Sequence, residues 1–155
     1  TSKDNGSKSL KFDLIEETIA RTSFKYLKKG DIVNLERSIK ASTEIGGHLM
    51  SGHVHFTAKV KKIIDKKNTR DMQISLAKKY SDYVMEKGYI GINGCSLTIG
   101  KVNANGFNIH LIPETLDITN LGQLSKGDLV NIEIDQNTIT VVNTVKKTLA
   151  TKISR

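Results

Sequence analysis

The chain has 155 residues, of which 37% are hydrophobic and 26% are charged, and its formal net charge is +8. This length is enough for one ordinary domain or two small ones with a buried core. No apolar run approaches the roughly 18 residues of a membrane span. The single cysteine, Cys95, excludes an internal disulfide, so we expect a reducing, cytoplasmic location.

The positive charge is spread along the chain and does not form one basic block. Lysines occur in separated pairs such as Lys28–Lys29 and Lys146–Lys147, and aromatic residues make up only 5% of the chain. Proteins that bind single-stranded nucleic acids place aromatic stacking platforms among their basic residues. The composition therefore favours a solvated basic surface, and we expect neither a nucleic-acid partner nor a membrane partner.

The first patterned segment, residues 12–36, is repeated further along the chain. The sequence "FDLIEETIARTSFKYLKKGDIVNLE" aligns with "IHLIPETLDITNLGQLSKGDLVNIE" at 109–133 with a constant offset of 97, and 12 of the 25 pairs are identical. Self-similarity of this extent indicates two copies of one folding unit. The second copy starts near His53, and subtracting 97 gives a position before Thr1. We therefore expect the first unit to be incomplete here.

Short β-branched runs behind glycine or asparagine turns predict strands in both copies. The runs are "KGDIVNLER" (29–37), "GHVHFTAKVKKII" (52–64), "KGDLVNIEID" (126–135) and "NTITVVNTV" (137–145). The segment 89–112 predicts three more strands, with "NG" hairpin turns at 93–94 and 105–106. Many short, evenly spaced strands favour small closed barrels.

Two helices are predicted. The first lies at about 79–86, with Tyr80 and Val84 on its inner face and Gly88 as its stop. The second is C-terminal, and its apolar residues are spaced 3, 4 and 4 apart: Val142, Val145, Leu149 and Ile153. Such a narrow apolar seam fits either packing on its own domain or self-association.

Three of the four histidines lie in "GGHLMSGHVHF", residues 46–56. His53 and His55 share one face of a strand, as zinc ligands do. A third ligand would require His48 to fold back, and the nearest acidic residue is Glu44, so we do not expect a metal. Two interpretations remain open. The segment is either a glycine-bent crossing between domains or part of a ligand pocket in which an imidazole moves protons.

The segment "KGYIGINGCSLTIG" concentrates small hydroxyl groups. Ser96 and Thr98 are two residues apart and so lie on one strand face, which suits hydrogen bonding to a flat polar heterocycle. Cys95 points to the other face and is interpreted as a buried apolar filler. The only proline, Pro113 in "LIPETLDIT", is expected to end a strand.

The segments "VNLERSIKASTEIGGHLMSGHVHFTAKV", "KGYIGINGCSLTIG" and "IHLIPETLDITNLG" together resemble the riboflavin synthase family of lumazine-binding enzymes. The resemblance extends from about Phe12 to the final helix. It implies an all-β fold of two tandem six-stranded Greek-key barrels plus a C-terminal helix. On this pattern residues 1–41 are the C-terminal half of the first, incomplete barrel. Residues 42–140 form the second barrel and 141–155 an oligomerisation helix.

The resemblance also implies an activity. The family converts two molecules of 6,7-dimethyl-8-ribityllumazine into riboflavin and 5-amino-6-ribitylaminouracil by moving a four-carbon unit, with no metal or cofactor. It works as a homotrimer in which the first barrel of one subunit faces the second barrel of another. Non-catalytic lumazine-carrying proteins share the fold and remain the alternative.

The family's site residues transfer to matching positions of this sequence. The expected catalytic residues are His48, His53, Ser96 and Thr98. The expected substrate-binding residues are Asp13, Leu14, Ile15, Glu16, Glu17, Thr18, Gly52, His53, Val54, Lys87, Ser96, Leu97, Thr98, Ile112, Pro113, Glu114, Thr115, Leu116 and Asp117. Asn93 stands where the family commonly has aspartate, so a turn role is expected there and not a carboxylate role.

Overall fold

A computed structural model describes residues 2–4 and 9–153. Its body is a curled, antiparallel, seven-stranded sheet with the strand order β6-β5-β9-β3-β4-β8-β7. The strands are β3 (Phe56–Asp65), β4 (Arg70–Ile74), β5 (Tyr89–Ile92), β6 (Cys95–Thr98), β7 (Val102–Asn103), β8 (Gly106–Leu111) and β9 (Leu129–Ile134). The helix α2 (Pro113–Ile118) and the 3-10 helices η2 (Lys78–Tyr83) and η3 (Asn120–Gln123) connect them.

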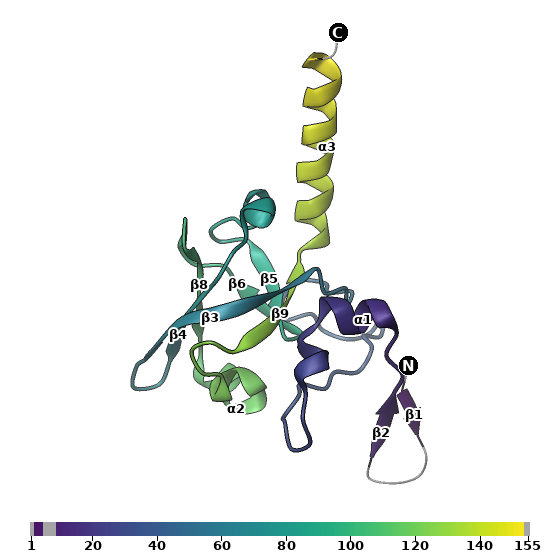
Figure 1. The fold of residues 1–155 in the computed structure, drawn as a ribbon, viewed down its shortest axis with the longest axis vertical. Coiled ribbons are helices and arrows are strands. Elements are labelled where there is room, and N and C mark those ends of the chain that lie inside the picture. The colour runs from purple at the N-terminus through teal and green to yellow at the C-terminus, as the bar shows by residue number, and fades with distance from the viewer. Residues whose placement is uncertain (1, 5–8, 154–155) are drawn as a thin grey trace.

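The N-terminal part of the chain lies beside this sheet. It contains a separate hairpin of β1 (Ser2–Asp4) and β2 (Leu10–Phe12), then α1 (Glu16–Arg21) and the 3-10 helix η1 (Ser23–Tyr26). Residues 27–55 have no helix or strand. Figure 1 shows the hairpin (purple) below α1, while α3 (Gln136–Ile153, yellow) stands away from the sheet at the other end of the long axis.

The core lies inside the curled sheet. The buried hydrophobic side chains of the described chain all fall between Ala58 and Ile134, and the largest is Phe107. Every residue of β9 from Val130 to Ile134 is buried. Alternate side chains of a strand point to opposite faces, so β9 is covered on both. The polar residues of β9, Asn131 and Glu133, therefore face the N-terminal part of the chain, which forms a second layer over the sheet.

Local geometry recurs at the 97-residue offset. Helices α1 and α2 begin and end 97 residues apart, as do η1 and η3. Gly30 and Gly127 both have φ of 101°, a left-handed conformation that favours glycine. Thr22 Oγ1 donates to the Thr18 carbonyl at 2.6 Å, and Thr119 Oγ1 donates to the Thr115 carbonyl at 2.6 Å.

Two reciprocal hydrogen bonds join the copies. The Ser23 amide donates to Asn131 Oδ1 at 2.7 Å, and the Asn120 amide donates to Asn34 Oδ1 at 2.7 Å. Since 23 + 97 = 120 and 34 + 97 = 131, the two bonds are the same contact made in both directions. The copies are therefore related locally by a pseudo-two-fold arrangement.

Asn93 lies at this junction. Its Oδ1 accepts from the Asn131 amide at 2.8 Å, its Nδ2 donates to Asn120 Oδ1 at 3.3 Å, and its carbonyl accepts from Asn34 Nδ2 at 2.9 Å. With φ values of 48° and 83°, Asn93 and Gly94 also form the predicted two-residue turn between β5 and β6. An amide that donates and accepts is suited to this position, because a carboxylate could not donate to Asn120.

Two strand predictions are wrong. Residues 29–37 form no strand, although their counterpart β9 does. The counterpart is paired with β3 and β5, whereas 29–37 pair with no strand of the described chain, and Asn34 and the Ile32 carbonyl instead bond to the second copy. The segment 137–145 lies in α3, because Asp135 caps a helix there by accepting from the Thr138 amide at 2.9 Å.

Three boundaries also differ from expectation. The C-terminal helix begins at Gln136 and not at 141. Segment 89–112 contains four strands, since the short β7 lies between β6 and β8. The helix expected at 79–86 is the 3-10 helix η2, which ends at Tyr83 because Val84 becomes extended and is buried in the core. None of the described helices is long and apolar enough to cross a membrane.

Candidate functional site

The crossing segment 46–54 packs directly on the hairpin of β5 and β6. Two glycines permit the close approach. A Cβ atom added to Gly47 would lie 2.4 Å from Ser96 Oγ, and one added to Gly91 would lie 2.8 Å from Met50 Sδ. Real Cβ atoms do not approach this closely, so Gly47 requires glycine as packed, whereas at Gly91 the flexible Met50 side chain would have to move. The histidine-rich loop is thereby brought against the hydroxyl-rich strand.

His48 and Ser96 form one cluster. His48 Nδ1 lies 2.6 Å from Ser96 Oγ, and the His48 amide donates to the same oxygen at 3.1 Å. The imidazole stacks on Tyr89 with ring centroids 5.1 Å apart. His48 Nε2 is buried and has no hydrogen-bond partner within the described part of the chain. Two of the expected catalytic residues are thus in direct contact.

Glu133 organises the next part of the loop. Its side chain is 8% exposed, and its carboxylate accepts from the Ser51 amide at 2.7 Å and from the Gly52 amide at 3.1 Å. These bonds hold Gly52 at φ of 79°, where a side chain would strain the backbone. Ser51 Oγ lies 3.0 Å from Glu133 Oε1 and 2.7 Å from His53 Nδ1. His53 itself is exposed.

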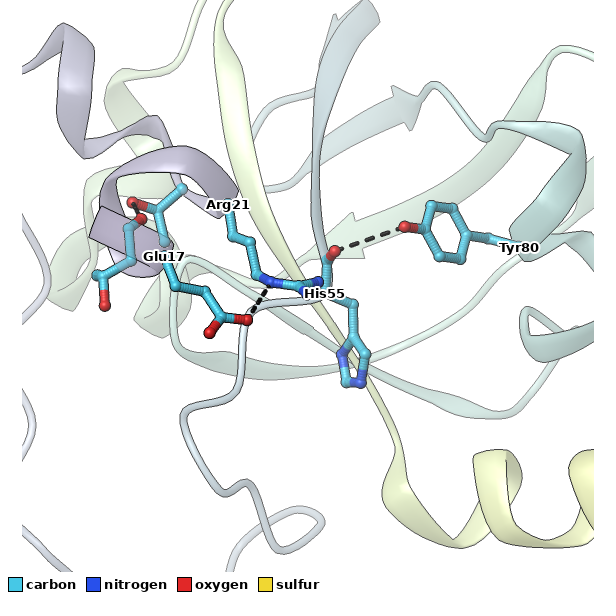
Figure 2. Close-up of polar contacts among 6 residues, drawn as sticks. Glu17, Arg21, His55 and Tyr80 are labelled. Atoms are coloured by element: carbon cyan, nitrogen blue, oxygen red, sulfur yellow. Dashed lines mark hydrogen bonds and ion pairs between the residues drawn. The ribbon is translucent and has the colours of Figure 1, made fainter. Parts of the chain in front are cut away.

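His55 has a different environment from His53. Its Nδ1 accepts from the Ile134 amide at 3.1 Å, and its carbonyl lies 3.5 Å from the Tyr80 hydroxyl. Figure 2 shows Arg21 extending from α1 toward His55 while Glu17 binds the guanidinium. Burial lowers the pKa of His55 and the charges of His53 and Arg21 lower it further, against the opposing carboxylate of Glu133.

The two histidines do not share a strand face, since β3 begins only at Phe56. Among residues 2–4 and 9–153, no three histidine, cysteine, aspartate or glutamate side chains are grouped as metal ligands. The nitrogen Nδ1 of each imidazole is instead taken by a hydrogen bond to this chain. The described residues therefore offer proton transfer and hydrogen bonding.

The expected second-copy residues lie at the ends of strands. Lys87 has φ of 68°, and its amide donates to the Ile99 carbonyl at 2.8 Å, next to the exposed Thr98. Leu97 packs on the core. Ile112 follows β8 and is 56% exposed, and Pro113 opens α2, so the strand ends where expected. Helix α2 carries the remaining residues: Glu114, Thr115, Leu116 and Asp117.

The expected first-copy residues, Asp13 to Thr18, lead into and form α1. Glu17 is paired with Arg21 at 2.7 Å, while Thr18 lines a cavity of about 850 Å³ between the two copies. Gly52 and Val54 line the same cavity. The structure therefore brings Thr18, Gly52 and Val54 together. Ser96 and His48 are not among the residues that line this cavity, and they form a separate cluster.

Sequence reasoning missed several residues that shape the site. Ser51 and Glu133 hold the loop, and Tyr89 stacks on His48. One signal for Glu133 was present, because a glutamate recurs inside the apolar run of both copies, at positions 36 and 133. Cys95 packs against the core as expected, and burial and the charge of Glu36 raise the pKa of its thiol.

Comparison with known proteins adds to this geometry. Residues 51–135 match the lumazine binding domain. The chain is 49% identical to riboflavin synthase of Escherichia coli (strain K12), with 91% of this chain and 67% of that protein covered. It is 46% identical to riboflavin synthase of Chlamydia pneumoniae, with 90% and 68% covered.

Solved structures show the same fold. The crystal structure of LumP complexed with 6,7-dimethyl-8-(1'-D-ribityl) lumazine superposes with a TM-score of 0.78 at 27% identity, covering 88% of this chain and 72% of that chain. The crystal structure of LumP complexed with riboflavin superposes with a TM-score of 0.71 at 30% identity, covering 79% and 66%.

Proposed function

Because the chain belongs to the riboflavin synthase family, we propose that it acts on 6,7-dimethyl-8-ribityllumazine. The reaction converts two molecules of this lumazine into riboflavin and 5-amino-6-ribitylaminouracil by transfer of a four-carbon unit, the last step of riboflavin biosynthesis. The observation that carries the proposal is the loop 47–53. Ser96 and Glu133 fix it by hydrogen bonds; His48 lies against the hydroxyl-bearing strand β6, and His53 is bonded to Ser51 beside Glu133 of β9.

The proposed roles follow from the chemistry. Deprotonation of an acidic ring methyl group, addition to a second ring and elimination require positioning and proton transfer more than a strong nucleophile. His53 and His48 transfer protons, and Ser96 and Thr98 bind polar ring atoms. The chain supplies these groups without a metal or cofactor.

The proposed binding sites follow the two copies. In the second, lumazine contacts Lys87, Ser96–Thr98 and Ile112–Asp117, and Gly52–Val54 of the crossing segment also lie against a bound lumazine. In the first, Asp13–Thr18 contribute the matching half. The equal bounds of α1 and α2 at the 97-residue offset support two related six-stranded barrels, formed by residues 1–41 as a partial unit and by residues 42–140. Two like pockets suit a reaction between two identical molecules.

We also propose a cytoplasmic homotrimer. The support is the seam of α3: Val145, Leu149 and Ile153 are all more than half exposed, while Val142, the first residue of the seam, is half-buried. Exposed apolar side chains three or four residues apart along one helix favour helix–helix association. In a trimer the first copy of one subunit would face the second copy of the next.

A non-catalytic lumazine or flavin carrier is the second candidate. The structural similarity to LumP, at a TM-score of 0.78, favours it as much as it favours an enzyme. The two can be separated by incubating the full-length protein with 6,7-dimethyl-8-ribityllumazine and following riboflavin by absorbance. Tight lumazine binding without riboflavin formation would reject the enzyme.

Replacing His53 tests the proposed proton transfer. In His53→Ala we expect turnover to fall by about 10²-fold, the lower end of what a placed general base contributes. Lumazine affinity should change far less, because the exposed ring makes few contacts that hold the loop. Turnover equal to that of the wild type would remove His53 from the reaction.

A further inference from the structure

Hydrogen bonds join a carboxylate of β9 to a hydroxyl and an imidazole of the crossing segment. Glu133 Oε1 is 3.0 Å from Ser51 Oγ, and Ser51 Oγ is 2.7 Å from His53 Nδ1. The carboxylate comes from β9, while the other two groups belong to the loop. The arrangement connects a buried charge to an exposed imidazole through a single hydroxyl.

The direction of each hydrogen bond follows from the groups. An ionised carboxylate can only accept, and Glu133 also accepts from the amides of Ser51 and Gly52. The one proton of the Ser51 hydroxyl therefore points to Glu133. Its oxygen is left to accept, so His53 Nδ1 must carry a proton and donate it to Ser51 Oγ.

This direction fixes the tautomer of His53. In a neutral imidazole, one nitrogen is a donor and the other an acceptor. With Nδ1 protonated, Nε2 holds the free lone pair, and Nε2 makes no hydrogen bond to the chain over the residues that the structure describes. His55 has the opposite tautomer, because its Nδ1 accepts from the Ile134 amide.

We propose that Glu133 and Ser51 are positioning residues that hold His53 with Nδ1 protonated, so that Nε2 is the atom that accepts the lumazine proton. This inference rests on the proposed function. In the step, the methyl C–H bond breaks, its electron pair remains on the lumazine ring system, and an N–H bond forms at Nε2. The resulting imidazolium keeps its Nδ1–H bond to Ser51, and the Glu133 carboxylate stabilises the positive charge.

The tautomer can be measured without substrate. In the chain labelled with ¹⁵N-histidine, two-bond ¹H–¹⁵N correlation spectra of the neutral imidazole should show Nδ1 of His53 as the protonated nitrogen and Nε2 as the unprotonated one. In Ser51→Ala this preference should be lost, and His55 should be unchanged and so serve as an internal control. In Ser51→Thr, which restores the hydroxyl, the wild-type pattern should return.

The hydrogen-bonded series Glu133–Ser51–His53 is called the relay below. Kinetics test whether the reaction uses it. We expect kcat of Ser51→Ala to fall at least about tenfold with little change in KM, part of the roughly 10²–10⁴-fold that general-base catalysis contributes. Ser51→Thr should recover most of it. Glu133→Gln should lower kcat as well, whereas Glu36→Gln, the same change at the repeat-related exposed position, should leave it unaltered.

The possible outcomes are distinct. A wild-type spectrum with Nε2 protonated, or a Ser51→Ala spectrum identical to it, would overturn the relay. An altered tautomer with unchanged kcat would overturn its use in the reaction. The expected nitrogen pattern in a chain that forms no riboflavin would reject the proposed function and leave the relay intact. Because Glu133 is buried, its variant is interpreted only if its thermal unfolding remains cooperative; the Ser51 variants carry the test otherwise.

Discussion

Each histidine of residues 46–56 has a different hydrogen-bond partner, and the partner determines what the imidazole can do. His48 is stacked on Tyr89 and bonded to Ser96, so it is held in place. His53 is exposed, with one nitrogen bound to Ser51. His55 accepts a backbone hydrogen bond. Three residues of one type within eight positions thus have separate roles.

His55 should make stability depend on pH. Burial is the main cause that lowers its pKa in the folded state, so the unfolded state binds the proton more strongly. Its contribution is therefore fully present above the unfolded pKa of about 6.5 and is lost as pH falls toward the folded value. His55→Asn keeps an acceptor near the Nδ1 position and does not titrate. Urea midpoints at about pH 7.5 and about pH 5.5 should differ less in this variant, and an equal difference would contradict the assignment.

Two glycines in hairpins differ in what they require of the chain. Gly94 lies in open space with φ of 83°, whereas a Cβ atom at Gly106 would meet the Ile74 carbonyl oxygen. The first position needs only a left-handed backbone, while the second also needs the absence of a side chain between β4 and β8.

Alanine substitution should separate these two needs. Gly94→Ala should lower the free energy of unfolding by about 1–2 kcal/mol, the cost of a left-handed residue. Gly106→Ala should cost several-fold more, because the overlap is with backbone and β4 must shift. Equal chemical denaturation midpoints for the two variants would show that β4 and β8 are not packed as described.

The turns and strands of the second copy could be predicted because their signals are local. "NG" specified the β5–β6 turn, and Pro113 specified the end of β8. Segment 137–145 could not, because its β-branched residues favour strands while the competing signal was the single cap at Asp135. Segment 29–37 failed for another reason, since a strand exists only with a partner, and pairing is not encoded in the segment itself.

The two copies are joined by hydrogen bonds to asparagine side chains, which is a property of the whole molecule. Asn131 is 8% exposed, and its Oδ1 accepts from the Ser23 amide. Asn131→Ala leaves that amide without its partner, so we expect a loss of about 1–3 kcal/mol in the free energy of unfolding. Asn68→Ala, at an exposed turn position, should change it by less than about 0.5 kcal/mol. Equal effects in denaturant titrations would contradict a joining role.

Association through α3 also belongs to this scale. Val145→Asp with Leu149→Asp places two charges on the exposed seam, so the variant should sediment as a monomer where the wild type sediments as a trimer. Thr144→Asp, outside the seam, serves as the control and should stay trimeric. A double variant that keeps the wild-type sedimentation coefficient would exclude the seam as the interface.

The assembly of the candidate site could not be predicted from the sequence. The family resemblance implied roles for His48 and Ser96 separately, yet their contact depends on Gly47, which lets two backbones approach. The recurrence of glutamate at positions 36 and 133 marked Glu133, but its contact with Ser51 could not be predicted, because a glutamate within a strand is ordinarily solvated and only the fold buries this one.

The reciprocal asparagine contact has a consequence for the history of the chain. Both the donor, the Asn120 amide, and the acceptor, Asn131, are present within the second copy alone. A solitary ancestor with this sequence would carry a self-complementary face and could satisfy both groups by pairing with an identical molecule, as isologous dimers do. Gene fusion would then have turned a dimer interface into an intramolecular one, and each half could diverge in sequence.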